Sequence, residues 1–207
     1  MSALTFAVTG AHAKRNAAAP AIVFDTQVTA PEPIEAMVLR AQIRIEPQWR
    51  EYDGAEKTLL VDLFDTPDRW GTTLHTLSWA DISLTIPAFY GDTHLEIAVP
   101  CTYDFDAVAT RYLNALGSGE IPVRFLFSGA IFRNAPAGFS TERVPWSSEA
   151  AYRMPLQVWH EAMRACYGDD ALIRVTRETL NRLQHYRALS GATSWDQLFD
   201  RLLGAPT

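Results

Sequence analysis

The sequence has only two cysteines, Cys101 and Cys166, and none of the short motifs that mark common active sites. A chain of 207 residues can bury a core without disulfides, so two separated cysteines favour a reducing, cytoplasmic environment. There is no CxxC and no HExxH, which removes the usual sequence evidence for a metal site. GxGxxG, P-loop and GxSxG motifs are also absent, so dinucleotide, nucleotide and serine-hydrolase sites have no support in the sequence.

Basic residues are outnumbered, and long apolar runs are missing. Lysine and arginine total 18 against 24 aspartate and glutamate, a net charge of −6. An acidic chain lacks the positive footprint of phosphate-backbone binding, so nucleic acid is not an expected partner. No apolar run approaches the ~18 residues of a membrane span, so no membrane is expected. Residues 4–8 are apolar, but no Lys or Arg precedes them, which predicts a first β-strand rather than a signal peptide.

Alternation with period two dominates the first two thirds of the chain. Apolar and polar residues alternate over 39–46, 81–86 and 94–99, as in strands with one wet face and one core face. Residues 4–8, 22–29 and 121–127 are further expected strands. The spacing, with Pro and Gly between strands, predicts an α+β protein built on an antiparallel β-sandwich, immunoglobulin-like or barrel-like, with inserted helices and a helical C-terminal element packed on it.

Capping signals place the helices. Asp53 and Glu56 have the form of a capping box, which predicts a helix near 54–65. A second helix is expected near 105–116, with Asp104 as its N-cap and Gly117 at its end.

Beyond residue 155 the period becomes 3.6. A helix is expected between Pro155 and Gly168, another after Thr176, and a third after a capping box at Ser194 and Gln197. The expected organisation is a β-sandwich body over 1–150 and a helical C-terminal element over 151–207. Their apolar stripes must be buried, so we expect one fused unit.

Few residues offer chemistry. His94 and Glu96 would share one strand face and His75 could add a third ligand, but a solvated strand face is the favoured reading and no metal or cofactor is expected. Cys101 precedes a helix start, where the pKa of a thiol can be lowered. It is the one nucleophile candidate, with His75, His160 or His185 as the base. A small buried residue is the favoured reading, and no catalytic residue is assigned.

Aromatic residues gather in or beside the connecting segments. Such residues often fill the core under loops, but exposed together they would suit a protein interface. The residues proposed for this interface are Trp49, Trp70, Phe89, Tyr90 and Trp146.

Several segments between residues 60 and 205 resemble a known bacterial family. They are 65–71 (DTPDRWG), 99–105 (VPCTYDF), 119–122 (GEIP), 126–129 (LFSG), 144–146 (VPW), 158–159 (VW) after Pro155, and 193–196 (TSWD). The family is one of unknown function, often encoded beside uptake nickel–iron hydrogenase genes and their maturation genes. The resemblance implies this context and supplies no catalytic residues. Two scattered cysteines cannot ligate a nickel–iron centre or a four-cysteine cluster.

The sequence therefore favours an accessory protein that binds another protein, with a hydrogenase subunit or maturation factor as the implied partner. The alternative is an enzyme or small-ligand-binding protein with an unfamiliar site near Cys101, and a scaffolding role is a third reading. The specific partner, the oligomeric state and the strand order are not determined by the sequence.

Overall fold

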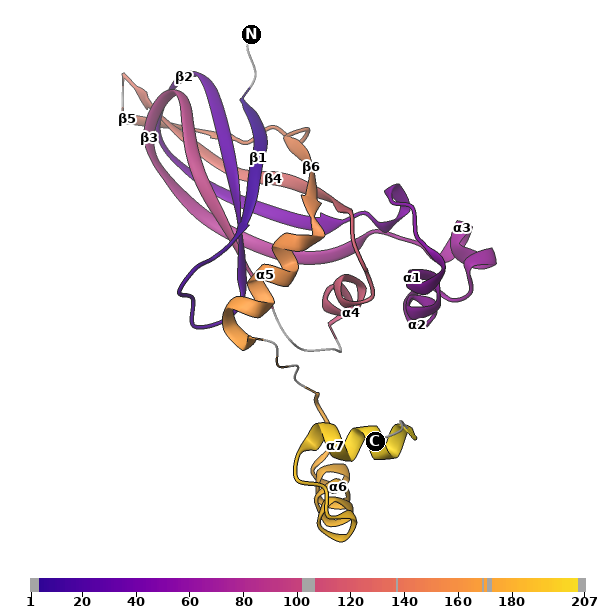
Figure 1. The fold of residues 1–207 in the computed structure, drawn as a ribbon. Coiled ribbons are helices and arrows are strands. Elements are labelled where there is room, and N and C mark those ends of the chain that lie inside the picture. The colour runs from indigo at the N-terminus through magenta and orange to yellow at the C-terminus, as the bar shows by residue number, and fades with distance from the viewer. Residues whose placement is uncertain (1–3, 102–106, 137, 169, 171–172, 205–207) are drawn as a thin grey trace. The chain divides into compact units, whose positions relative to one another are not determined.

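Long antiparallel β-strands make up most of the computed structural model, which describes residues 4–101, 107–136, 138–168, 170 and 173–204 (Figure 1). The strands are β1 (Thr5–Ala13), β2 (Ala21–Ile45), β3 (Leu77–Pro100), β4 (Glu120–Ala135), β5 (Gly138–Arg143) and β6 (Glu149–Pro155). Neighbours pair in the order β1-β2-β4-β5, with β3 also on β2 and β6 also on β4. All these pairings are antiparallel, which confirms the predicted α+β, sandwich-like fold.

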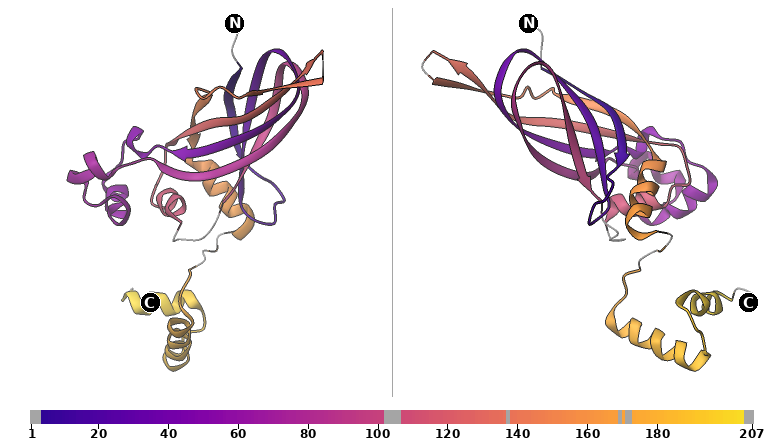
Figure 2. Two further views of the ribbon diagram at one scale, coloured as in Figure 1. Left: turned by 180° about the vertical axis from the view of Figure 1, so that it is seen from behind. Right: turned by 60° about the vertical axis from the view of Figure 1, so that its left-hand side comes forward.

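The two longest strands, β2 and β3, run through both halves of the sandwich: the half that contains β1 and the half that contains β4. The first half of β2 pairs with β1 and with the end of β3, and its second half pairs with β4 and the start of β3. The expected strands 22–29 and 39–45 are thus one strand, and 81–86 and 94–99 are another. The sequence signal suggested breaks because Pro31 and Pro33 interrupt β2, but the register shifts between Ala30 and Ile34, so these prolines sit in a bulge instead of a turn. Figure 2 shows β2 and β3 curving along their length.

The core lies between the two halves. Phe24 of β2 is fully buried, and its ring meets those of Trp79 (5.9 Å), Phe125 (5.0 Å) and Tyr152 (6.2 Å) edge-on. These partners come from β3, β4 and β6. Edge-to-face contacts at such spacing stabilise the fold beyond the burial of the rings, so this aromatic group stabilises the packing of the two halves.

A close approach of β2 and β4 requires a glycine. Gly129 has φ of 146°, and a Cβ atom there would lie 2.0 Å from the main-chain oxygen of Val38. L side chains rarely adopt this backbone conformation, and the space beside it is occupied by backbone. The two strands can therefore pair here only if residue 129 has no side chain.

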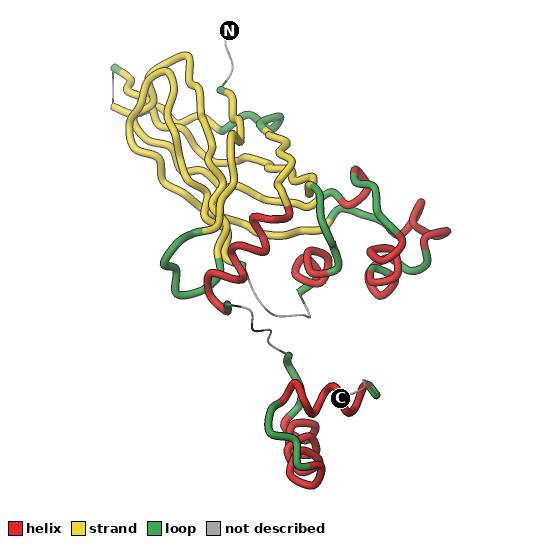
Figure 3. Tube along the Cα trace, in the orientation of Figure 1, coloured by secondary structure: helices red, strands yellow, loops and turns green. Residues whose placement is uncertain are grey.

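Short helices fill the connection between β2 and β3, beyond one end of the sheet (Figure 3). They are η1 (Pro47–Trp49), α1 (Gly54–Leu59), α2 (Val61–Phe64), η2 (Pro67–Arg69) and α3 (Trp70–Thr73). The capping box at Asp53 and Glu56 is confirmed, and the expected helix 54–65 is divided at Leu60.

Two further helices complete the body. α4 (Val108–Asn114) contacts β3 and α2, whereas the expected N-cap Asp104 lies outside the described residues. α5 (Leu156–Tyr167) starts after Pro155 and ends at Gly168, as predicted, and packs on β1 and β2. Its buried Trp159 donates an indole hydrogen bond to Asn114 Oδ1 at 3.0 Å.

The chain divides into two compact units, residues 1–171 and 172–207. The second contains α6 (Arg177–Ser190) and α7 (Trp195–Leu203), with Thr176 and Ser194 as N-caps, as predicted. Leu198 of α7 is fully buried, and the Arg187 guanidinium of α6 lies 5.0 Å from the centre of the Trp195 ring. The boundary expected at residue 150 falls within β6, and α5 belongs to the first unit. That the body and the terminal helices form one fused unit stays a prediction.

Candidate functional site

A cleft of about 830 Å³ opens where the end of β2 meets the start of β4. We call it the Trp49 cleft; it is lined by Trp49, Arg50, Glu51, Tyr52, Asp53, Glu56, Ser118, Gly119, Glu120 and Arg153. A second hollow of about 260 Å³ shares Trp49 and Arg153 with it. Trp49 therefore stands between two depressions, and 62% of it is exposed.

The floor of the cleft is a buried ion pair. Arg50 and Glu56 meet through two hydrogen bonds of 2.9 Å each, and their side chains are only 8% and 6% exposed. Glu56 is placed by its role in the capping box, in which its main-chain N–H donates to Asp53 Oδ1 at 2.8 Å. A two-point arginine–carboxylate pair fixes both the distance and the plane of the guanidinium.

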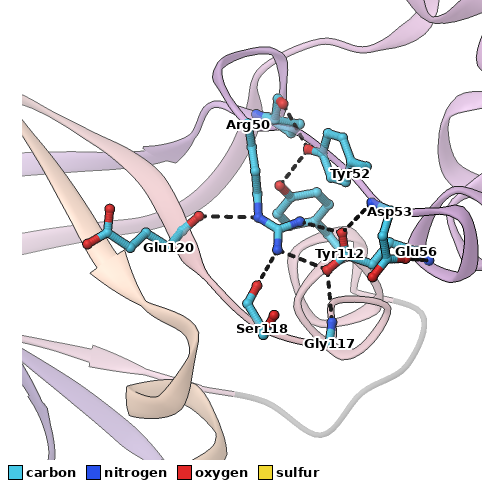
Figure 4. Close-up of polar contacts among 9 residues, drawn as sticks. Arg50, Tyr52, Asp53, Glu56, Tyr112, Gly117, Ser118 and Glu120 are labelled. Carbon is cyan, nitrogen blue, oxygen red and sulfur yellow. Dashed lines mark hydrogen bonds and ion pairs between the residues drawn. The ribbon is translucent and has the colours of Figure 1, made fainter.

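The same pair is hydrogen-bonded to residues 117–120, which precede and begin β4 (Figure 4). The Gly117 N–H donates to Glu56 Oε1 at 2.9 Å, and Arg50 Nε donates to the main-chain oxygen of Glu120 at 3.2 Å. Arg50 also donates to the main-chain oxygen of Ser118. These bonds join the connection after β2 to the connection before β4, so the walls of the cleft are held by one fully paired network.

Two tyrosines extend the network inward. The hydroxyls of Tyr52 and Tyr112 lie 2.7 Å apart, and Tyr52 donates to the main-chain oxygen of Pro47 at 2.8 Å. Burial raises the pKa of Tyr52 far above its ordinary value and raises the pKa of Tyr112 to about 12. Both hydroxyls are therefore neutral at physiological pH. The Arg50 guanidinium lies 5.1 Å from the centre of the Tyr52 ring, a further attraction that orients it.

This arrangement is a closed network of hydrogen bonds. Every polar group of the Arg50–Glu56 pair is engaged within the protein, and the tyrosines hold their protons tightly. The groups that this network leaves at the surface of the cleft are Trp49 and the charged side chains on the rim.

The five predicted interface residues are spread over the first unit. Trp49 and Trp70 both lie beside Tyr52: Trp49 lines the same cleft, and the half-buried Trp70 ring meets that of Tyr52 edge-on at 5.1 Å. Phe89 and Tyr90 lie next to the bulge in the β2–β3 pairing, with Phe89 half-buried and Tyr90 71% exposed. Trp146 is 97% exposed in the connection between β5 and β6. That the five act as one interface stays a prediction.

Sequence reasoning missed the Arg50–Glu56 pair. The capping box identified Glu56 as a helix-start residue, but a carboxylate in that role is usually solvated. Nothing local signals that Gly117, which lies 61 positions away, also donates to it.

Cys101 is buried in the hydrophobic core. Its main-chain N–H donates to Pro20 O at 2.8 Å, and its thiol contacts Val99 O at 3.6 Å. Burial raises the pKa of the Cys101 thiol to about 12, so the thiolate required for nucleophilic attack is scarce at neutral pH. These observations argue against a site at Cys101.

We expect the two cysteines to react differently with Ellman's reagent. In native protein at pH 7.5, the half-buried Cys166 should react fast and Cys101 slowly, so that C166S is nearly inert until denaturant is added. The measurement is the time course of absorbance from the coloured thiolate that Ellman's reagent releases, recorded for wild type, C166S and C101S. Fast labelling of native C166S would restore Cys101 as a candidate nucleophile.

Metal ligands do not gather in the part of the chain that the structure describes. His94 and Glu96 lie opposite Gln27 and Asp25 in the β2–β3 ladder, both exposed. Within the described residues, no group of three or more His, Cys, Asp or Glu side chains is arranged to hold a metal ion. The described helices are also too short or too polar to cross a membrane.

Three solved structures show a distant likeness to this chain. A late embryogenesis abundant (LEA) protein shares 14% identity over 75% of this chain and 73% of its own, with a TM-score of 0.34. The β-glucosidase 3B of Thermotoga neapolitana shares 12% identity over 74% of this chain and 17% of its own (TM-score 0.28). A β-glucosidase of Kluyveromyces marxianus shares 8% identity over 74% of this chain and 15% of its own, with a TM-score of 0.25. No argument about function rests on similarity at these scores.

Curated proteins provide no match. One family does match, over residues 1–207, and it is described as a family of unknown function. The match covers the terminal strands and helices as well as the segments that carried the resemblance in the sequence. The chain therefore belongs, over its whole length, to the family of unknown function DUF6084.

Proposed function

We propose that this protein is a non-catalytic, cytoplasmic accessory protein that binds another protein through the Trp49 cleft. The observation that carries the proposal is that Trp49, which is 62% exposed, lines the same cleft as the buried, fully hydrogen-bonded Arg50–Glu56 pair. A tryptophan side chain is large and has only two rotatable side-chain bonds, so it loses little conformational entropy on binding, and tryptophan is enriched among the residues that dominate interfaces.

The depressions on either side of Trp49 strengthen this reading. A partner that covers Trp49 can place side chains in both, and buried contact around a central aromatic residue excludes water from it. The fully exposed Trp146 would belong to a second contact or to the outer part of a larger one. The family resemblance names hydrogenase subunits and maturation factors as the first partners to test.

The test is affinity purification of the tagged full chain from its native host, grown on hydrogen, with quantitative mass spectrometry. We expect hydrogenase subunits or maturation factors to be enriched with wild type, and W49A to lower their recovery by about tenfold or more, as for a central interface tryptophan. F139A is the matched control, because Phe139 is an aromatic residue on β5 that is also exposed and lies outside the cleft.

Two results would count against the proposal. Equal recovery with wild type and W49A would remove Trp49 from the interface. If neither set of proteins is enriched, and a deletion strain takes up hydrogen normally, the hydrogenase association is wrong.

A further inference from the structure

The rim of the Trp49 cleft is negatively charged. Glu51, Asp53 and Glu120 line it, and among the described residues Arg153 is the one cation that lines it outside the buried pair. Arg50 does not offset the rim carboxylates, because Glu56 already neutralises it. The charge presented to a partner is therefore negative, beside the exposed face of Trp49.

The rim carboxylates are not consumed by the network beneath them. Glu120 contributes only its main-chain oxygen to Arg50, and Figure 4 shows its carboxylate pointing away from the guanidinium. Glu51 and Glu120 are both exposed. Asp53 caps α1 through Oδ1, which leaves its second oxygen. Carboxylate oxygens thus remain as acceptors around the tryptophan.

The adjoining hollow adds no excess of negative charge, because Arg124 and Arg153 line it together with Glu46. There Arg124 is paired with Glu46 at 2.8 Å and with Glu149 at 3.1 Å, so two carboxylates surround one guanidinium. The excess of carboxylates is therefore confined to the cleft that Glu51, Asp53 and Glu120 line.

We propose that the Trp49 cleft receives an arginine side chain from a basic segment of the partner protein. A guanidinium is planar, stacks on an indole face and donates two parallel hydrogen bonds to a carboxylate, so it satisfies both features of the cleft at once. A neutral apolar segment would leave the carboxylates unpaired, and an acidic one would be repelled. This inference rests on the proposed function, because it names the chemistry of the protein bound there.

The test begins with a random-peptide display library selected on immobilised full chain and, in parallel, on W49A. We expect peptides enriched only on wild type to share an arginine. The best peptide is then synthesised with that arginine or with citrulline, which keeps the shape and removes the charge. Calorimetry with wild type should show about fivefold weaker binding of the citrulline peptide, as for loss of exposed ion pairs.

Charge variants provide the matched comparison. E51Q/E120Q should weaken binding of the arginine peptide about fivefold and leave the citrulline peptide unchanged. D68N/D170N removes the same charge at two exposed positions that do not line the cleft, and should bind within about twofold of wild type.

The outcomes separate the two proposals. Peptides that need Trp49 but carry no arginine or lysine would overturn the basic partner and keep the cleft as a protein-binding site. If D68N/D170N weakens binding as much as E51Q/E120Q, the attraction is general charge and the proposed arginine site is wrong. If the peptides selected on wild type bind W49A equally well, the cleft is not a peptide-binding surface, and the proposed function is wrong as well.

Discussion

Replacing Glu56 with glutamine is expected to lower the free energy of unfolding by about 3–5 kcal/mol, because it leaves the Arg50 guanidinium buried without a counter-charge. The change conserves size, so the loss reports charge and hydrogen bonding instead of a cavity. Equilibrium urea denaturation at pH 7 measures it. E51Q is the matched control: Glu51 is exposed, and its change should stay within about 0.5 kcal/mol of wild type.

The effect should depend on pH in a defined direction. Burial tends to raise the pKa of the Glu56 carboxyl, but hydrogen bonds from Arg50 and from the main-chain N–H groups of Gly117 and Asp53 outweigh it, so the pKa lies below its ordinary value of 4.5. The carboxylate therefore stabilises the fold above the unfolded pKa, and this contribution is lost as the pH falls through the lowered folded pKa. The difference in free energy of unfolding between wild type and E56Q should have its full size at pH 7 and become smaller below pH 4.5. An E56Q protein as stable as wild type at pH 7 would show that the pair is dispensable.

Replacing Gly129 with alanine should be at least as damaging, at about 3 kcal/mol or more. The new methyl group would have to occupy a point 2.0 Å from Val38 O, in a backbone conformation with φ of 146°. Relief requires β2 and β4 to separate where Leu39 pairs with Gly129. Thermal and urea unfolding of G129A measure the loss, and a protein that expresses only as aggregate would agree with it.

Gly71 provides the control for that experiment. It lies in α3, and a Cβ atom there would have nothing within 4 Å. Because alanine favours helix over glycine, G71A should be neutral or more stable by up to about 1 kcal/mol. If G129A is as stable as G71A, the two strands can rearrange around a side chain and the close approach is not needed.

Local patterns predicted much of the fold. Period-two alternation over 39–46 and 94–99 placed β-structure with the correct faces inward, because one face of each strand is buried and the other is wet. Caps at Asp53, Thr176 and Ser194 predicted three helix starts. These features depend on neighbours within a few residues, which a single sequence displays.

What the sequence did not predict depends on distant residues. β5 has no buried residue to produce a pattern, and it forms because β4 offers an unpaired edge. Residues 22–29 and 39–45 form one strand because β3 pairs with β2 on both sides of the bulge at Pro31 and Pro33, and a partner so distant in sequence leaves no local pattern. At the cleft, Trp49 was named as an interface candidate, but its support was hidden because Arg50, Glu56 and Gly117 meet only in the folded chain.

The connection between β2 and β3 leaves the sheet at Ile45 and returns at its paired neighbour Leu77. Trp49, Arg50, Tyr52 and Glu56 all lie within that excursion, so a large part of the cleft wall is one continuous stretch of sequence. Substitutions there can alter the surface of the cleft while every strand pairing stays in register. Provided that the Arg50–Glu56 pair is retained, the shape and charge of this wall can change independently of the sheet that carries it.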